Sequence, residues 1–198
     1  MRRSTKLNIG LFAGAILAFG SGSVIAFGGD GGGDGSLRAH AVVEGAPGSG
    51  VEGVVRFTQA PADADAPTPG VRVVASVTGL SPGLHGLHIH ENGVCEPPSF
   101  TAAGGHYDPG PYGNSNPDAN HPFHMGDLPN LVADAAGAGH LSAITSRVTL
   151  SAGPTTLFDA DGSAVIVHLN PDQGIPGPPG SGVSGGPRVA CGVIVPDA

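Results

Sequence analysis

Apolar and polar residues alternate or cluster in short runs along most of the chain after residue 36. Some runs have the period of two that is typical of half-buried strands, others are rich in valine, and none has a helical period of useful length. Clusters of Gly, Pro, Asp and Asn separate the runs. The strand-like runs are residues 37–43, 53–59, 71–80, 128–133, 140–150, 164–169 and 189–195. About eight short strands with such turns predict an all-β fold, a Greek-key β-sandwich or barrel.

Two long segments interrupt this pattern. Residues 93–129 are polar and nearly free of strand signal, and residues 170–187 consist largely of Gly and Pro. Each segment follows a strand end that carries histidine, and loops of this length in a small domain are usually functional. We therefore expect two long functional loops on the predicted sheet.

The first 36 residues differ from the rest. Arg2, Arg3 and Lys6 precede an uncharged apolar run and then small residues, the order typical of a signal peptide over residues 1–26. The alternative is a retained N-terminal anchor, because residues 8–29 are just long enough to span a bilayer. Residues 27–36 are interpreted as a Gly/Asp-rich linker and residues 37–198 as the folded domain. The pattern predicts export to the periplasm, cell envelope or extracellular space, with membrane contact only if the leader is retained.

The net charge of the mature chain limits the classes of partner that it is expected to bind. Without the leader, five arginines and no lysine stand against 16 acidic residues, a net charge of −11. A domain of this charge is a poor candidate for binding nucleic acid or anionic lipid.

The chain has two cysteines, Cys95 and Cys191. In an exported protein they suggest one disulfide, which would close a long loop. The alternative is two independent buried thiols.

Histidines supply the candidate chemistry. His88 and His90 are two residues apart, so in a strand they face the same side while Leu87 and Ile89 face the core. A His-x-His pair alone is a weak indication of a metal site, since two hydrogen-bonded or surface histidines would give the same pattern.

Three further segments strengthen the metal interpretation. His106 follows two glycines, and residues 121–127 hold His121, His124 and Asp127, which are suitable zinc ligands. His168 ends an apolar strand, where a hydrogen-bonded core histidine is the alternative. Together, three or four imidazoles without a thiolate suit Cu(II) or Zn(II).

In their order along the chain and in their amino-acid sequences, these segments resemble the copper,zinc superoxide dismutases, from about residue 37 to residue 195. The resemblance rests on Gly-Leu-His-Ile-His-Glu at residues 86–91, Ala-Gly-Gly-His-Tyr-Asp-Pro at 103–109 and His-Met-Gly-Asp-Leu-Pro-Asn at 124–130. It extends to Val-His at 167–168 and to Gly-Pro-Arg-Val-Ala-Cys-Gly-Val-Ile at 186–194. The spacing between Cys95 and His106 resembles the bacterial members.

The resemblance implies two metals. The implied copper ligands are His88, His90, His106 and His168, and the implied zinc ligands include His106, His124 and Asp127. It also implies the disulfide Cys95–Cys191, a catalytic Arg188 beside the copper, and Asp172 as a residue that orients ligands.

The chain departs from the family pattern in two places. Asn114 stands where the family usually has a zinc histidine, and His121 is the nearest replacement. We expect His121 to be a zinc ligand on its chemistry and crowding with His124; the alternative is a weak or empty zinc site. In addition, the loop of residues 170–187 has Asp172 as its only charged residue, whereas relatives often carry charges there that guide the substrate.

The expected function is an exported enzyme that converts superoxide to dioxygen and hydrogen peroxide, with His106 bridging copper and zinc. Two rival functions are an exported copper carrier on the same fold and a structural zinc-only domain. The sequence leaves a homodimer open. We expect His85 to brace the sheet by hydrogen bonds, and His40 and His140 to occupy surface or strand positions.

Overall fold

The computed structural model describes residues 35–61, 69–110 and 113–198. The leader and most of the linker lie outside the described residues, so the predicted signal peptide or anchor stays a prediction. Within the described ranges, no helix is long and apolar enough to cross a membrane.

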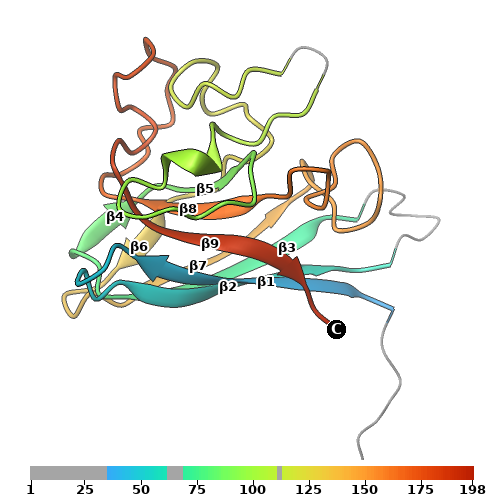
Figure 1. The fold of residues 1–198 in the computed structure, drawn as a ribbon, viewed down its shortest axis with the longest axis horizontal. Helices are drawn as coiled ribbons and strands as arrows, with labels where there is room; N and C mark the ends of the chain where they lie inside the picture. Colours follow the sequence, from blue (N-terminus) through green and yellow to red (C-terminus); the bar gives the residue numbers. More distant parts are fainter. Residues whose placement is uncertain (1–34, 62–68, 111–112) are drawn as a thin grey trace, which may run out of the picture. The chain divides into compact units, whose positions relative to one another are not determined.

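Nine antiparallel strands form one sheet that curls into a nearly closed barrel (Figure 1). The strands are β1 (Leu37–Gly45), β2 (Glu52–Gln59), β3 (Val71–Thr78), β4 (Gly83–His85), β5 (Leu87–His90), β6 (Leu131–Ala133), β7 (Gly139–Thr145), β8 (Ala164–His168) and β9 (Arg188–Pro196). Their order in the sheet is β4-β6-β7-β3-β2-β1-β9-β8-β5. The predicted all-β Greek-key fold is confirmed, with nine strands where about eight were expected.

The two edge strands of the sheet, β4 and β5, are consecutive in sequence and separated by Gly86 alone. The chain therefore joins the two ends of the sheet directly. Gly86 also pairs across to the β8 side, because its carbonyl accepts the amide of His168 at 2.8 Å and its amide donates to the carbonyl of Asn170 at 2.9 Å.

Alternation fixes which face of each strand is buried. In β3, Val71, Val73, Ala75 and Val77 are buried while the residues between them are more exposed. These side chains join the main core with Leu87 and Ile89 of β5 and Val165 and Val167 of β8, as predicted for β5.

Strands β5 and β8 are buried on both faces. Their second faces are covered from outside the barrel, and a smaller core of Phe100, Ala103, Ala164, Ile166 and Cys191 lies there. Two long segments provide the cover. We call them the β5–β6 connection (residues 91–130) and the β8–β9 connection (residues 169–187), and Figure 1 shows them above β5, β8 and β9.

Two predicted strands are shorter than expected. The run 128–133 pairs only from Leu131, and Pro129 before it has no amide to donate to a neighbouring strand. The run 140–150 leaves the sheet after Thr145, whose hydroxyl accepts the amide of Arg147 and begins a turn.

Candidate metal centre

Strands β5 and β8 present three of the six histidines at this end of the barrel. His88 and His90 alternate with the core residues Leu87 and Ile89, so both imidazoles stand on the outer face of β5. His168 ends β8 on the neighbouring strand, and its ring centroid lies 4.8 Å from that of His88.

His106 is brought to β5 by a turn that requires glycine. A Cβ on Gly105 would lie 1.9 Å from the carbonyl oxygen of Ser115, which instead accepts the amide of His106 at 2.8 Å. His106 forms an isolated antiparallel bridge with His90, and its ring centroid lies 4.1 Å from that of His88.

One group of candidate metal-binding side chains therefore comprises His88, His90, His106 and His168, with the nearest ligand atoms all within 4.8 Å of one another. All four side chains are buried. In each ring one nitrogen is hydrogen-bonded: His88 Nε2 donates to Asp172 at 3.0 Å, His90 Nδ1 to the carbonyl of Gly104 at 3.0 Å, His106 Nδ1 to Asp127 at 2.6 Å and His168 Nδ1 to the carbonyl of Gly186 at 2.9 Å.

The second nitrogen of each of these rings is buried without a hydrogen-bond partner in the described structure. These atoms are His88 Nδ1, His90 Nε2, His106 Nε2 and His168 Nε2. A buried polar atom without a partner is costly, whereas an imidazole whose other nitrogen donates a proton presents a free lone pair, as metal ligands do. The donor set thus fits a metal with four imidazole ligands.

A second group contains His106 again, with His121, His124 and Asp127. The Nδ1 atoms of the three histidines lie 2.6, 3.3 and 3.0 Å from oxygens of the Asp127 carboxylate. This carboxylate also accepts the amide of His124 at 3.0 Å, which fixes it within its own turn. Three imidazoles and one carboxylate are the ligand types of a zinc site.

Asp172 connects the two groups. Its Oδ2 accepts His88 Nε2 at 3.0 Å, and its Oδ1 accepts His121 Nε2 at 2.6 Å. Asn130 holds Asp172 in turn, since its side chain donates to the Asp172 carbonyl at 2.9 Å and accepts the Asp172 amide at 2.8 Å.

Burial sets the protonation of three rings of the first group, those of His90, His106 and His168. Desolvation and the neighbouring imidazoles hold the pKa of His90 and His168 well below the usual value, and they lower the pKa of His106 to about 3 although Asp127 opposes the shift. These rings are therefore neutral at pH 7, the form that binds metals.

His121 behaves differently because it faces two carboxylates. Burial lowers its pKa, but hydrogen bonds to Asp127 and Asp172 outweigh this effect and raise the pKa to about 9. The pKa values of both carboxyl groups are held well below their usual range because hydrogen bonds from the histidines outweigh burial.

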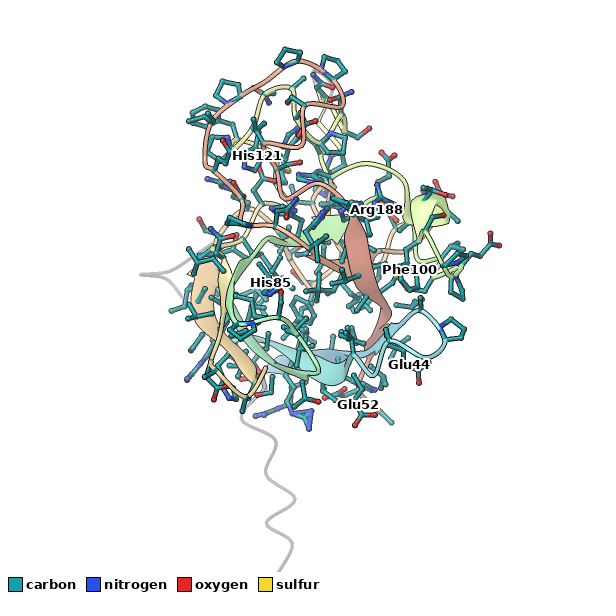
Figure 2. All side chains as sticks on the ribbon, turned by 90° about the vertical axis from the view of Figure 1, so that its left-hand side faces the viewer. Glu44, Glu52, His85, Phe100, His121 and Arg188 are labelled. Atoms are coloured by element: carbon teal, nitrogen blue, oxygen red, sulfur yellow. A yellow bond between two sulfur atoms is a disulfide. The ribbon has the colours of Figure 1, made fainter. Side chains whose placement is uncertain are left out.

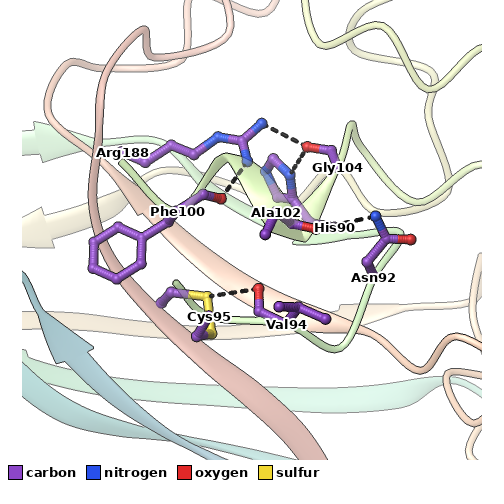
Figure 3. The surroundings of a disulfide bond; sticks show 9 residues. His90, Asn92, Val94, Cys95, Phe100, Ala102, Gly104 and Arg188 are labelled. Carbon is purple, nitrogen blue, oxygen red and sulfur yellow. Dashed lines mark hydrogen bonds between the residues drawn. A yellow bond between two sulfur atoms is a disulfide. The ribbon is translucent and has the colours of Figure 1, made fainter. Parts of the chain in front are cut away.

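Arg188, at the start of β9, lies beside the first group. Figure 3 shows its guanidinium donating to the carbonyls of Phe100 at 2.7 Å and Gly104 at 2.6 Å, and Gly104 also accepts His90. Its positive charge is near enough to contribute to the low pKa of His90 and His168. The predicted disulfide Cys95–Cys191 is confirmed and anchors the same stretch of the β5–β6 connection to β9.

Other predicted positions fall outside both groups. Asn114 is exposed, and its amide donates to Asp108 at 2.8 Å. His85 lies inside the ring of strands (Figure 2), where its ring nitrogens are 2.7 and 2.8 Å from the carbonyl oxygens of His168 and Ser81. His40 pairs with Asp197, and His140 is exposed on β7.

Sequence reasoning missed two residues that support the groups. Asn130 was noted only within a motif, and Arg147 was not singled out, yet its guanidinium donates to the carbonyls of Pro122 and His124 at 3.0 Å each. Neither contact has a local signal, because the partners are 42 and 23–25 residues away in sequence.

An antiparallel barrel with two histidine groups that share one ring defines this chain as a candidate histidine-rich metalloprotein. The sequence model of copper/zinc superoxide dismutase matches residues 51–194. The chain therefore belongs to the copper/zinc superoxide dismutase family. This confirms the predicted resemblance and agrees with the prediction of an oxidoreductase that uses copper and zinc.

Individual relatives support this assignment. The chain is 41% identical to a Cu-Zn superoxide dismutase of Caulobacter vibrioides, over 79% of this chain and 84% of that protein. It is 40% identical to that of Deinococcus radiodurans, over 65% and 72% of the two chains. The crystal structure of a double mutant of a SOD-like protein from Bacillus subtilis matches with a TM-score of 0.62 and 30% identity, covering 78% of this chain and 95% of the other.

Proposed function

We propose that this chain is an exported superoxide dismutase, which converts two superoxide anions and two protons into dioxygen and hydrogen peroxide. The observation that carries the proposal is the position of His106, which belongs to both groups of candidate ligands. Its unpartnered Nε2 belongs with the first group, while its Nδ1 lies 2.6 Å from Asp127 of the second.

In this proposal His88, His90, His106 and His168 hold copper, and His106, His121, His124 and Asp127 hold zinc. The four buried nitrogens without partners support the copper set. The common approach of three Nδ1 atoms to Asp127 supports the zinc set, with His121 in place of the family histidine that Asn114 replaces.

Bound copper would supply the one-electron exchange, taking an electron from one superoxide and giving it to a second. The residues of the chain supply protons and positive charge. A proton taken up at His106 Nε2 during turnover would lie where the reduced dioxygen species has to be protonated, and Asp127, 2.6 Å from Nδ1, helps to hold that ring in place. Asp172 orients His88 and His121 in the same way.

Arg188 provides the fixed positive charge that attracts the anion. Its bonds to two carbonyls hold the planar guanidinium in one orientation, which a lysine could not reproduce. This charge acts against the net charge of −11 of the mature chain.

The leader pattern of the sequence supports export, and a disulfide is typical of exported proteins. We keep periplasm, cell envelope and extracellular space as the proposed locations. A homodimer stays an open prediction, as does membrane contact through a retained leader.

The test is superoxide consumption by the purified protein loaded with copper and zinc, followed by pulse radiolysis. We expect rapid dismutation, and loss of activity in His168→Ala with zinc retained. His140→Ala, an exposed histidine on β7, is the matched control. Tight copper binding without dismutation would favour the copper carrier, and full activity of His168→Ala would contradict the proposed copper ligands.

A further inference from the structure

Asp118 is a buried carboxylate on the β5–β6 connection that belongs to neither group of candidate ligands. It is 4% exposed. The side chain of Asn116 fixes its backbone, accepting the amides of Asp118 at 3.2 Å and Ala119 at 3.1 Å. A buried carboxylate at a fixed position needs hydrogen-bond donors.

All the donors that reach this carboxylate in the described contacts come from the β8–β9 connection. Oδ2 accepts the amide of Gly182 at 3.0 Å, and Oδ1 accepts the amide and the hydroxyl of Ser184 at 3.2 and 2.9 Å. The carbonyl of Asp118 also accepts the amide of Gly177 at 2.8 Å. One residue therefore fastens residues 177–184 to the other connection.

The β8–β9 connection is poorly suited to order itself. Its 19 residues include six glycines, which lose the most backbone entropy on ordering, and five prolines, which have no amide to donate. Asn130 fastens its first part at Asp172. The bonds of Asn130 end at Asp172, and the side chain of Asp118 fastens the later part through Gly182 and Ser184.

The segment that Asp118 fastens is connected to the histidine rings through two sets of contacts. Ser184 forms an isolated bridge with Asp172, which contacts His88 and His121. Two residues beyond Ser184, the carbonyl of Gly186 accepts His168 Nδ1 at 2.9 Å. Displacement of residues 182–186 would thus alter the orientation of rings in both groups.

We propose that Asp118 is a positioning residue that holds the β8–β9 connection over the metal centre and thereby orients the histidines through Asp172 and Gly186. The role in metal binding rests on the proposed function, whereas the contact between the two connections does not. Among the described contacts, the Asp118 side chain reaches none of the candidate ligands and acts through the segment that it fastens.

The test compares Asp118→Asn with the unmodified full chain, both loaded with copper and zinc. An asparagine places an N–H group against an N–H donor of Gly182 or Ser184, so at least one bond is lost. The matched control is Asp134→Asn, because Asp134 also accepts two backbone amides, at 2.8 and 2.9 Å, but lies in the exposed turn between β6 and β7.

We expect amide exchange in residues 173–184 to accelerate about tenfold in Asp118→Asn, as for the loss of a hydrogen bond to a charged group. We also expect zinc affinity to fall about tenfold in a chelator competition, the lower end for loss of a group that supports metal ligands. The EPR spectrum of bound Cu(II) should change, and none of the three readouts should change in Asp134→Asn.

Ser184→Ala removes only the hydroxyl donor and should shift the same readouts in the same direction by a smaller factor, which keeps the test decisive if Asp118→Asn does not fold. Unchanged exchange in residues 173–184 would overturn the fastening role. Faster exchange with unchanged zinc affinity and EPR spectrum would overturn the positioning role. Absence of dismutation by the unmodified protein would refute the proposed enzyme and leave the exchange result intact.

Discussion

Replacing His121 by alanine tests the least conventional part of the centre. The variant removes one of the four side chains of the second group and leaves the four nitrogens of the first group in place. Four-ligand zinc sites bind with about 10–16 kcal/mol, so one ligand accounts for about 2.5–4 kcal/mol, or about 100- to 1000-fold in affinity.

The size of the effect should depend on pH. The pKa of His121 is raised to about 9, so the ring is protonated at pH 7 and has to lose that proton before it can bind zinc. The zinc affinity of the unmodified protein should therefore gain a factor of about ten per pH unit from this ring up to pH 9, a gain that the alanine variant lacks. The full difference is expected at pH 9, and little of it at pH 7.

Chelator competition between pH 7 and pH 9 measures this difference, and calorimetry in buffers of different ionisation enthalpy counts the released proton. We expect about one proton from His121 per zinc at pH 7. His140→Ala should behave like the unmodified protein, because His140 is exposed and contacts Ser76. Equal zinc affinities of His121→Ala and the unmodified protein at pH 9 would refute the assignment of His121 as a zinc ligand.

Three further predictions concern the surroundings of the centre. Arg188→Ala should lower kcat/KM about tenfold or more and weaken its salt dependence, with Arg188→Lys intermediate; an unchanged rate at low salt in pulse radiolysis would contradict the steering role. Replacing both Cys95 and Cys191 by serine should lower the free energy of unfolding in urea by about 4–5 kcal/mol, since the bond closes a 96-residue separation, and a loss under about 1 kcal/mol would argue against this. Gly105→Ala should reduce the copper and zinc bound per chain, because its Cβ would overlap the Ser115 carbonyl; full metal content would disprove that constraint.

The sequence predicted the strands best where one face is buried. The alternation in β1 and β3 and the apolar run in β8 correspond to their burial. The ends were less predictable. Leu128 and Leu150 are buried in the core like strand residues but lie outside the strands, so apolar character alone extended two predicted strands too far. Burial and strand pairing are separate properties, and the pattern reports only the first.

The candidate site was predictable to the extent that its chemistry is local. His88 and His90 share one strand, and His121, His124 and Asp127 share one short segment, so their spacing carries information. The role of Asp118 carries no such signal, because its partners are 59–66 residues away on a connection of irregular backbone. The ligand role of His121 stays a prediction, which the approach of its Nδ1 to Asp127 supports.

The position of β5 at the edge of the sheet has a consequence for solubility. An uncovered edge strand offers free amides and carbonyls to another chain and is a site of aggregation. Here the β5–β6 connection occupies that edge: the amide of Ile89 donates to Gly126 at 2.9 Å, and its carbonyl accepts the amide of Tyr107 at 2.9 Å. The segment that carries His106 and Asp127 thus also shields the sheet from intermolecular pairing, so selection for the centre and selection against aggregation act on the same residues.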